Sequence, residues 1–144
     1  MSRDKFDEFV EKLQEEIMRQ EIEEFNEHIV KLYHNPINWG RMDGLEATVS
    51  ASYKGPCGDT MEFYLKIKDD LIEKASFFTD GCGATVAAGS QTTQMITNKP
   101  VSYAKSLTPN DIDEALKGLP DNHKHCAVLA INTLKKALEK YKKE

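Results

Sequence analysis

The sequence of 144 residues contains no apolar run approaching the roughly 18 residues that a membrane-spanning helix needs. Glycine and proline are also scarce, at eight and five residues, which excludes collagen-like and low-complexity chains. The remainder is 40% hydrophobic and 30% charged, as in ordinary globular proteins. Because the length is close to the roughly 150 residues of one domain, we expect a single folded unit and no membrane partner.

Cysteine is rare and odd in number, with three residues. The first twenty residues hold ten charged side chains and therefore no apolar leader segment. We accordingly predict a cytoplasmic protein. In a reducing compartment its cysteines would be core residues, metal ligands or reactive thiols instead of disulfides.

Basic residues are outnumbered, and the imbalance lies at one end. Residues 1–34 contain ten acidic and five basic side chains, whereas residues 35–144 contain fourteen of each. An acidic arm on a neutral body is unsuited to phosphate backbones, so we expect no nucleic-acid partner. The sequence also contains neither G-x-x-x-x-G-K-[ST] nor G-x-S-x-G, which argues against nucleotide hydrolysis and serine esterase chemistry.

Apolar residues recur at three- and four-residue steps along the N-terminal arm, which predicts one long or two consecutive amphipathic helices. They are Phe6, Phe9, Val10, Leu13 and Ile17, then Ile22, Phe25, Ile29 and Leu32. Asn35-Pro36 should end the helical region, because proline cannot continue a helix from its interior.

Alternating apolar and polar residues predict strands over 47–53 and 61–67, joined by the turn Gly55–Asp59. Asp69-Asp70 predicts a second turn before a third strand over 72–79. Further helices are predicted over 84–97, from the N-cap Thr108 to residue 117, and over 122–142. The expected fold is α+β: a three-stranded antiparallel sheet with helices packed on one face, plus an N-terminal helical extension.

Each cysteine lies at a break in these elements: Cys57 in a turn, Cys82 between glycines before a helix, and Cys126 near the start of the last helix. A helix N-terminus lowers a thiol's pKa below about 8.5, so Cys82 and Cys126 are predicted thiolates. Their spacing matches no compact zinc motif, and free cysteine is often an inert core residue. Both interpretations stay open on this pattern.

Oxygen and nitrogen donors lie close to these thiols in the sequence. Asp59, two residues after Cys57, is either a turn residue or a hard oxygen ligand. His123 and His125 lie beside Cys126, either as solvated side chains or as borderline metal donors.

Four ordered blocks together resemble the iron–sulfur cluster assembly scaffolds of the IscU and NifU N-terminal type. They are Asn35-Pro36-Ile37-Asn38-Trp39-Gly40, Gly55-Pro56-Cys57-Gly58-Asp59, Thr79-Asp80-Gly81-Cys82-Gly83-Ala84, and Leu119-Pro120 with His125-Cys126. The resemblance implies a scaffold domain over residues 21–144 and a helical extension over residues 1–20.

The resemblance implies that Cys57, Cys82 and Cys126 are thiolate ligands of a transient 2Fe-2S cluster, with Asp59 and His125 as alternative fourth ligands or iron-binding groups. Cys126 would accept persulfide sulfur. The implied partners are a cysteine desulfurase, iron and electron donors, and apo iron–sulfur acceptor proteins. The protein would be a carrier of Fe²⁺ and cluster and not a turnover enzyme, and Zn²⁺ would also suit the donor set as isolated.

One segment departs from the family. Leu119-Pro120-Asp121-Asn122-His123 stands where IscU-type members carry Leu-Pro-Pro-Val-Lys for a dedicated chaperone, so the resemblance does not carry that chaperone over to this chain. Since His123 replaces a lysine, any electrostatic help to sulfur transfer would depend on pH.

Two alternative functions remain. A SufU-type zinc protein shares the fold and relays sulfur, although Gly83 after Cys82 and His125 before Cys126 favour the IscU type. In the second alternative, the protein is a non-catalytic interaction protein whose acidic arm carries the function and whose cysteines are inert.

Overall fold

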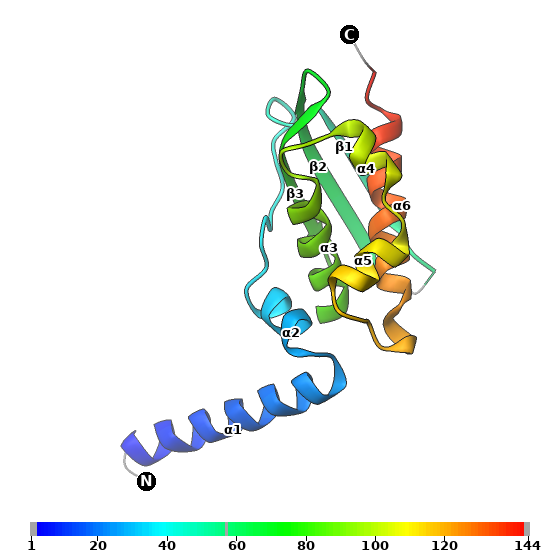
Figure 1. The fold of residues 1–144 in the computed structure, drawn as a ribbon. Coiled ribbons are helices and arrows are strands. Elements are labelled where there is room, and N and C mark those ends of the chain that lie inside the picture. Colours follow the sequence, from blue (N-terminus) through cyan, green and yellow to red (C-terminus); the bar gives the residue numbers. More distant parts are fainter. Residues whose placement is uncertain (1–2, 57, 143–144) are drawn as a thin grey trace.

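The computed structural model describes residues 3–56 and 58–142, whose arrangement is shown in Figure 1. The N-terminal half contains α1 (Arg3–Glu24), α2 (Glu27–His34), β1 (Val49–Lys54), β2 (Thr60–Lys68) and β3 (Leu71–Thr79). The C-terminal half contains α3 (Gly83–Ile96), β4 (Lys99–Pro100), α4 (Val101–Ser106), α5 (Pro109–Ala115), the 3-10 helix η1 (Asp121–His123) and α6 (His125–Glu139).

The sheet is antiparallel with the strand order β1-β2-β3-β4. The α+β class is confirmed, but the prediction of three strands is wrong because the described residues form four. The added strand β4 consists only of Lys99 and Pro100, which pair with Ile72 and Leu71. Two exposed residues show no alternation of apolar and polar side chains, so the sequence pattern does not reveal this strand.

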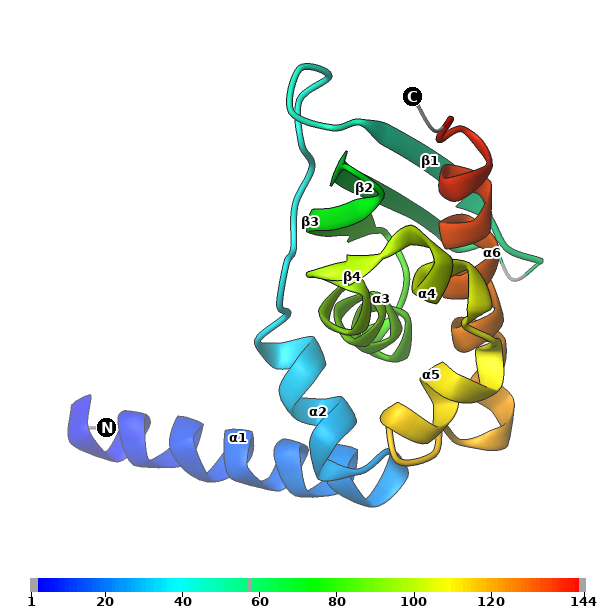
Figure 2. The same cartoon turned by 45° about the horizontal axis from the view of Figure 1, so that its top comes forward.

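One face of the sheet carries the core. Met61, Phe63 and Leu65 alternate along β2 and are fully buried, because α3 and α6 pack against this face (Figure 2). Close approach of α3 requires a small residue, since a Cβ on Gly89 would lie 2.4 Å from the Phe77 ring. The small side chains of α3 therefore let the helix lie directly on the sheet.

The N-terminal arm forms two helices, which is one of the two arrangements that its periodicity predicts. Asn26 lies between them as the N-cap residue of α2. Its Oδ1 accepts a hydrogen bond from Ile29 N at 2.9 Å. Helix α2 ends before Asn35-Pro36, as predicted, and packs against α3. Helix α1 extends away from the rest of the molecule (Figure 1). Within the described residues, no helix is both long and apolar enough to pass through a bilayer.

The C-terminal helices combine a confirmed cap with two unpredicted features. Thr108 caps α5 in a capping box with Asp111, whose carboxylate accepts a hydrogen bond from Thr108 N at 2.8 Å. Helix α4 was not predicted, because six residues are too few for a helical period to show. The last helix starts later than predicted, at His125, because η1 takes the place of its first turn.

Candidate metal centre

Three segments that are distant in sequence meet at one end of the sheet. Asp59 ends the β1–β2 turn, Cys82 is the N-cap residue of α3, and Cys126 is the second residue of α6. Thr60 N donates to Asp80 Oδ1 at 2.8 Å and so ties the β1–β2 turn to the loop before α3. The fold therefore brings one carboxylate and two thiols to the same place.

The hydroxyl of Thr85 connects these three side chains. Its Oγ1 donates to Asp59 Oδ2 at 3.1 Å, and lies 3.3 Å from Cys126 Sγ and 3.6 Å from Cys82 Sγ. Thr85 and Cys126 are fully buried, so the contact between their side chains is shielded from water. The sequence analysis did not single out Thr85. The only signal for it was its position three residues after Cys82, which places both on one helix face.

The pKa values of the two thiols are shifted in opposite directions. The pKa of Cys82 is lowered to about 4, chiefly by a hydrogen bond from the Cys126 thiol and also by the Thr85 hydroxyl and the backbone at the start of α3, against an opposing effect of burial. The same hydrogen bond, with burial, raises the pKa of Cys126. Cys82 is exposed and Cys126 buried. In the metal-free pair Cys82 is therefore the thiolate and Cys126 keeps its proton. The expectation that Cys126 is also a thiolate is wrong for this state.

Both C-terminal histidines lie near these sulfurs, in different ways. A ring nitrogen of His123 forms a group with the Sγ atoms of Cys82 and Cys126 in which all ligand atoms lie within 4.8 Å of one another. His125 Nε2 lies 3.7 Å from Cys126 Sγ. The two imidazole rings stack with centroids 6.2 Å apart. The sequence pattern left both histidines open as metal donors, and the family resemblance implied His125 alone.

Cys57, the third predicted thiolate ligand, lies outside the described residues. The turn beside it is tight: Gly55 N donates to Asp59 O at 2.8 Å, and Gly58 has a φ of +91° that favours glycine. The carboxylate of Asp59 is therefore positioned by its backbone as well as by Thr85.

The described donors fit a borderline divalent metal. Zinc binds thiolate sulfur at about 2.3 Å and imidazole nitrogen at about 2.0–2.1 Å, so ligand atoms around one ion lie about 3.5–3.8 Å apart. The ligand atoms of Cys82, His123 and Cys126 lie within 4.8 Å of one another. Side-chain rotations that move these atoms by about 1 Å would bring them to the spacing around one ion. Sulfur and imidazole nitrogen suit iron and zinc and not magnesium or calcium.

Two glycines permit this close assembly. A Cβ on Gly81 would lie 2.8 Å from Asp59 Oδ2 and 2.9 Å from Thr85 Cβ. A Cβ on Gly83 would lie 2.9 Å from the Tyr33 ring on α2. The glycines around Cys82 therefore admit the carboxylate on one side and a supporting helix on the other.

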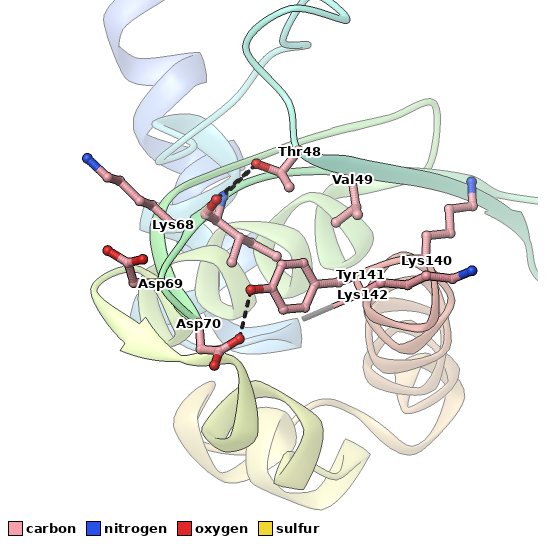
Figure 3. Close-up of a pocket in the computed structure, with 9 residues that line it drawn as sticks. Thr48, Val49, Lys68, Asp69, Asp70, Lys140, Tyr141 and Lys142 are labelled. Atoms are coloured by element: carbon pink, nitrogen blue, oxygen red, sulfur yellow. Dashed lines mark hydrogen bonds between the residues drawn. The ribbon is translucent and has the colours of Figure 1, made fainter. Parts of the chain in front are cut away.

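A cavity of about 690 Å³ lies at the other end of α6 (Figure 3). Val49, Ile67, Tyr141 and lysine and aspartate side chains line it, and Tyr141 donates to Asp70 Oδ1 at 2.7 Å. The described residues that line it include no cysteine or histidine. This cavity is therefore separate from the group of Cys82, His123 and Cys126, which lies at the start of α6.

Known sequences match most of this chain. The profile of the NifU-like N terminal domain matches residues 24–144. The "Iron-sulfur cluster assembly scaffold protein IscU" of Aquifex aeolicus is 38% identical over 120 residues, covering 82% of this chain and 76% of the relative. The protein of the same name from Escherichia coli K12 is 35% identical over 121 residues, covering 82% and 94%.

Solved structures share the architecture. A nitrogen-fixing NifU-like protein (N-terminal) from Brucella abortus superposes with a TM-score of 0.66 at 16% identity, covering 85% of this chain and 95% of that one. A putative iron-sulfur cluster assembly scaffold protein for the SUF system from Fervidobacterium islandicum gives 0.62 at 19% identity, covering 81% and 98%. At these identities the likeness establishes the fold.

Proposed function

The chain belongs to the NifU-like N-terminal domain family, and from this premise we propose that it is a scaffold on which a transient 2Fe-2S cluster is assembled and then passed to acceptor proteins. Its relatives are named as scaffolds for iron–sulfur cluster assembly. In this proposal iron and cluster are cargo, and the protein is a carrier. The proposal takes residues 21–144 as the scaffold domain and residues 1–20 as an N-terminal extension, to which α1 belongs from Arg3 onward.

The observation that carries this proposal is the convergence of Cys82, Cys126 and Asp59 around Thr85, with two imidazoles beside them. Three thiolates, including that of Cys57, supplemented by Asp59 or His125, would hold a cluster less firmly than the four thiolates of ferredoxin-type sites. A less firmly held cluster can leave for an acceptor.

Sulfur would enter at Cys126. The Cys126 thiol, whose pKa is raised, first gives up its proton to solvent or to a base on the desulfurase. Its sulfur then attacks the outer sulfur of a persulfide on a cysteine desulfurase, the sulfur–sulfur bond of the donor breaks, a new one forms on Cys126, and the donor cysteine leaves as a thiolate. An electron donor then reduces the transferred sulfur to sulfide. Because Cys126 is buried, its sulfur has to become accessible to the desulfurase for this exchange, whereas Cys82 is already exposed. Mass spectrometry of desulfurase-treated protein tests the assignment, and a persulfide found only on Cys82 would overturn it.

Asp59 would keep the cluster transferable. Its carboxylate is a harder donor than thiolate and is already held by the Thr85 hydroxyl. Asp59→Ala should therefore give a cluster that leaves more slowly for an acceptor. Transfer at the wild-type rate would show that this role is wrong.

The central test is anaerobic assembly with Fe²⁺, cysteine and a desulfurase, followed by timed transfer to apo-ferredoxin. Visible absorbance and circular dichroism should show a cluster that forms and then moves to the ferredoxin. Cys82→Ser and Cys126→Ser should abolish formation, and Ser76→Ala, a buried change outside the site, should not. Formation without transfer would indicate a stable cluster protein. Zinc in the purified protein would decide nothing, because the same donors suit zinc.

A further inference from the structure

His123 occupies a position that the proposed cluster ligands do not account for. Among the described residues, it is the histidine whose ring nitrogen groups with both Cys82 Sγ and Cys126 Sγ within 4.8 Å. His125 is adjacent to Cys126 in sequence and lies 3.7 Å from its sulfur, yet it is not in this three-residue group. The geometry therefore distinguishes the two imidazoles.

One nitrogen of His123 is buried without a partner. Nδ1 of His123 and Oγ of Ser76 are the buried side-chain polar atoms that have no hydrogen-bond partner in the described part of the chain. Such an atom costs about 1–3 kcal/mol when it is left unsatisfied. Phe25 covers the His123 ring at a centroid distance of 5.1 Å, and the His125 ring stacks beside it. A metal ion between the sulfurs would bind this imidazole.

The segment that carries His123 is held in place from two sides. Asn26, the cap of α2, donates from Nδ2 to Leu116 O at 3.0 Å. The carboxylate of Asp113 accepts hydrogen bonds from Leu119 N at 2.8 Å and from Lys124 Nζ at 3.1 Å. The imidazole is therefore positioned before any metal arrives, which lowers the entropic cost of binding.

We propose that His123 supplies the imidazole ligand to the first divalent metal ion held by Cys82 and Cys126. This inference rests on the proposed scaffold function and adds a ligand to it. Two thiolates and one neutral imidazole balance the charge of Fe²⁺ or Zn²⁺, and all three are donors that these ions prefer. His125 and Asp59 then remain for the later stages of assembly.

Anaerobic titration with Co²⁺, followed by absorbance and X-ray absorption fine structure, tests this ligand. His123→Ala should lower Co²⁺ affinity by about 10–100-fold and remove imidazole scattering from the spectrum. His28→Ala is the matched control, because His28 Nε2 lies 2.8 Å from Gln91 Oε1 and His28 is not in the group with the two sulfurs, so affinity and imidazole scattering should stay as in the wild type. His123→Cys should restore affinity with an additional sulfur ligand, which separates loss of a ligand from loss of local folding.

The outcomes distinguish this inference from the function on which it rests. If His123→Ala binds Co²⁺ with wild-type affinity and spectrum while Cys82→Ser and Cys126→Ser lose it, the inference is wrong and the scaffold function stands. The inference is also wrong if His125→Ala, and not His123→Ala, loses the imidazole signal. If the two cysteine variants bind Co²⁺ like the wild type, both proposals fail together.

Discussion

Helix α1 and the sheet both carry phenylalanine side chains in a periodic apolar pattern, but the surroundings of these side chains are very different. Phe6 and Phe9 on α1 are 57% and 59% exposed, whereas Phe63 and Phe77 in the sheet are fully buried. A periodic apolar pattern therefore predicts an element with one apolar face, but it does not predict which surface, if any, covers that face.

The two regions also differ in what holds them. The body buries a continuous core of sheet and helices, and its contacts fix Asp59, Thr85 and the segment before α6. Helix α1 gains little from tertiary packing, which supplies most of the stability of helices in proteins. Changes in the body should therefore alter stability and the metal site, and equivalent changes on α1 should alter neither.

The largest expected contrast is in thiol acidity. Since the pKa of Cys82 is lowered to about 4, it is a thiolate throughout the neutral range, and its alkylation rate should stay constant between about pH 6 and 9. A cysteine placed on α1 by Glu8→Cys should react with an ordinary profile that rises around pH 8.5. Iodoacetamide labelling followed by peptide mass spectrometry measures both sites in one sample. The same pH profile at both sites would contradict the lowered pKa of Cys82.

Truncation of a core aromatic residue should give the next largest effect. Phe77→Ala should lower the free energy of unfolding by about 3–5 kcal/mol, because the ring is fully buried against α3. Phe9→Ala removes the same side chain from α1 and should change the body's unfolding by no more than about 0.5 kcal/mol. Urea denaturation followed by fluorescence of Trp39 compares them. Equal losses would show that α1 packs against the body in solution.

A smaller effect is expected where α3 meets the sheet. Gly89→Ala should destabilise by about 1–3 kcal/mol, because the added Cβ lies 2.4 Å from Phe77 and overpacking exceeds the gain in helix propensity. Gly44→Ala meets no atom within 4 Å and serves as control. Thermal unfolding of the two variants is the measurement, and a stabilised Gly89→Ala variant would mean that the helix can move off the sheet.

Loss of a helix cap should cost less again. Thr108→Ala removes the acceptor for Asp111 N and should lower stability by about 1 kcal/mol. Thr108→Ser keeps the hydroxyl and should behave like the wild type in the same urea titration. A loss as large with serine as with alanine would place the effect in the methyl group.

The smallest effect is expected from α1 itself. Leu13→Ala on its exposed apolar face should leave both the body's unfolding and Co²⁺ affinity unchanged, within about 0.5 kcal/mol. Titration of this variant beside wild type provides the measurement. A weakened metal site would mean that the arm contributes to it.

Local patterns predicted the local structure well. Asn35-Pro36 marked the end of α2, Thr108 marked the cap of α5, and alternation marked three strands, because each signal lies within a few neighbouring residues. Strand β4 and helix α4 were missed because they are shorter than the periods that would reveal them.

The site was less accessible from sequence, for a different reason. The family resemblance implied metal chemistry at Cys82, but neither the central position of Thr85 nor the grouping of His123 with both sulfurs follows from spacing. Both depend on how α3, η1 and α6 are oriented by distant contacts, such as that of Asn26 with Leu116.

Periodicity was enough to predict the α+β class and its main elements, and the order of the motifs was enough to indicate the family, because these depend on residues that are close together along the chain. Packing alone assigned the surroundings: it left the α1 aromatics in water, placed one thiol of the pair inside and the other outside, and grouped His123 with the two sulfurs. The physical reason is that burial and ligand geometry arise from contacts between residues far apart in sequence, whose free energies depend on the folded arrangement as a whole.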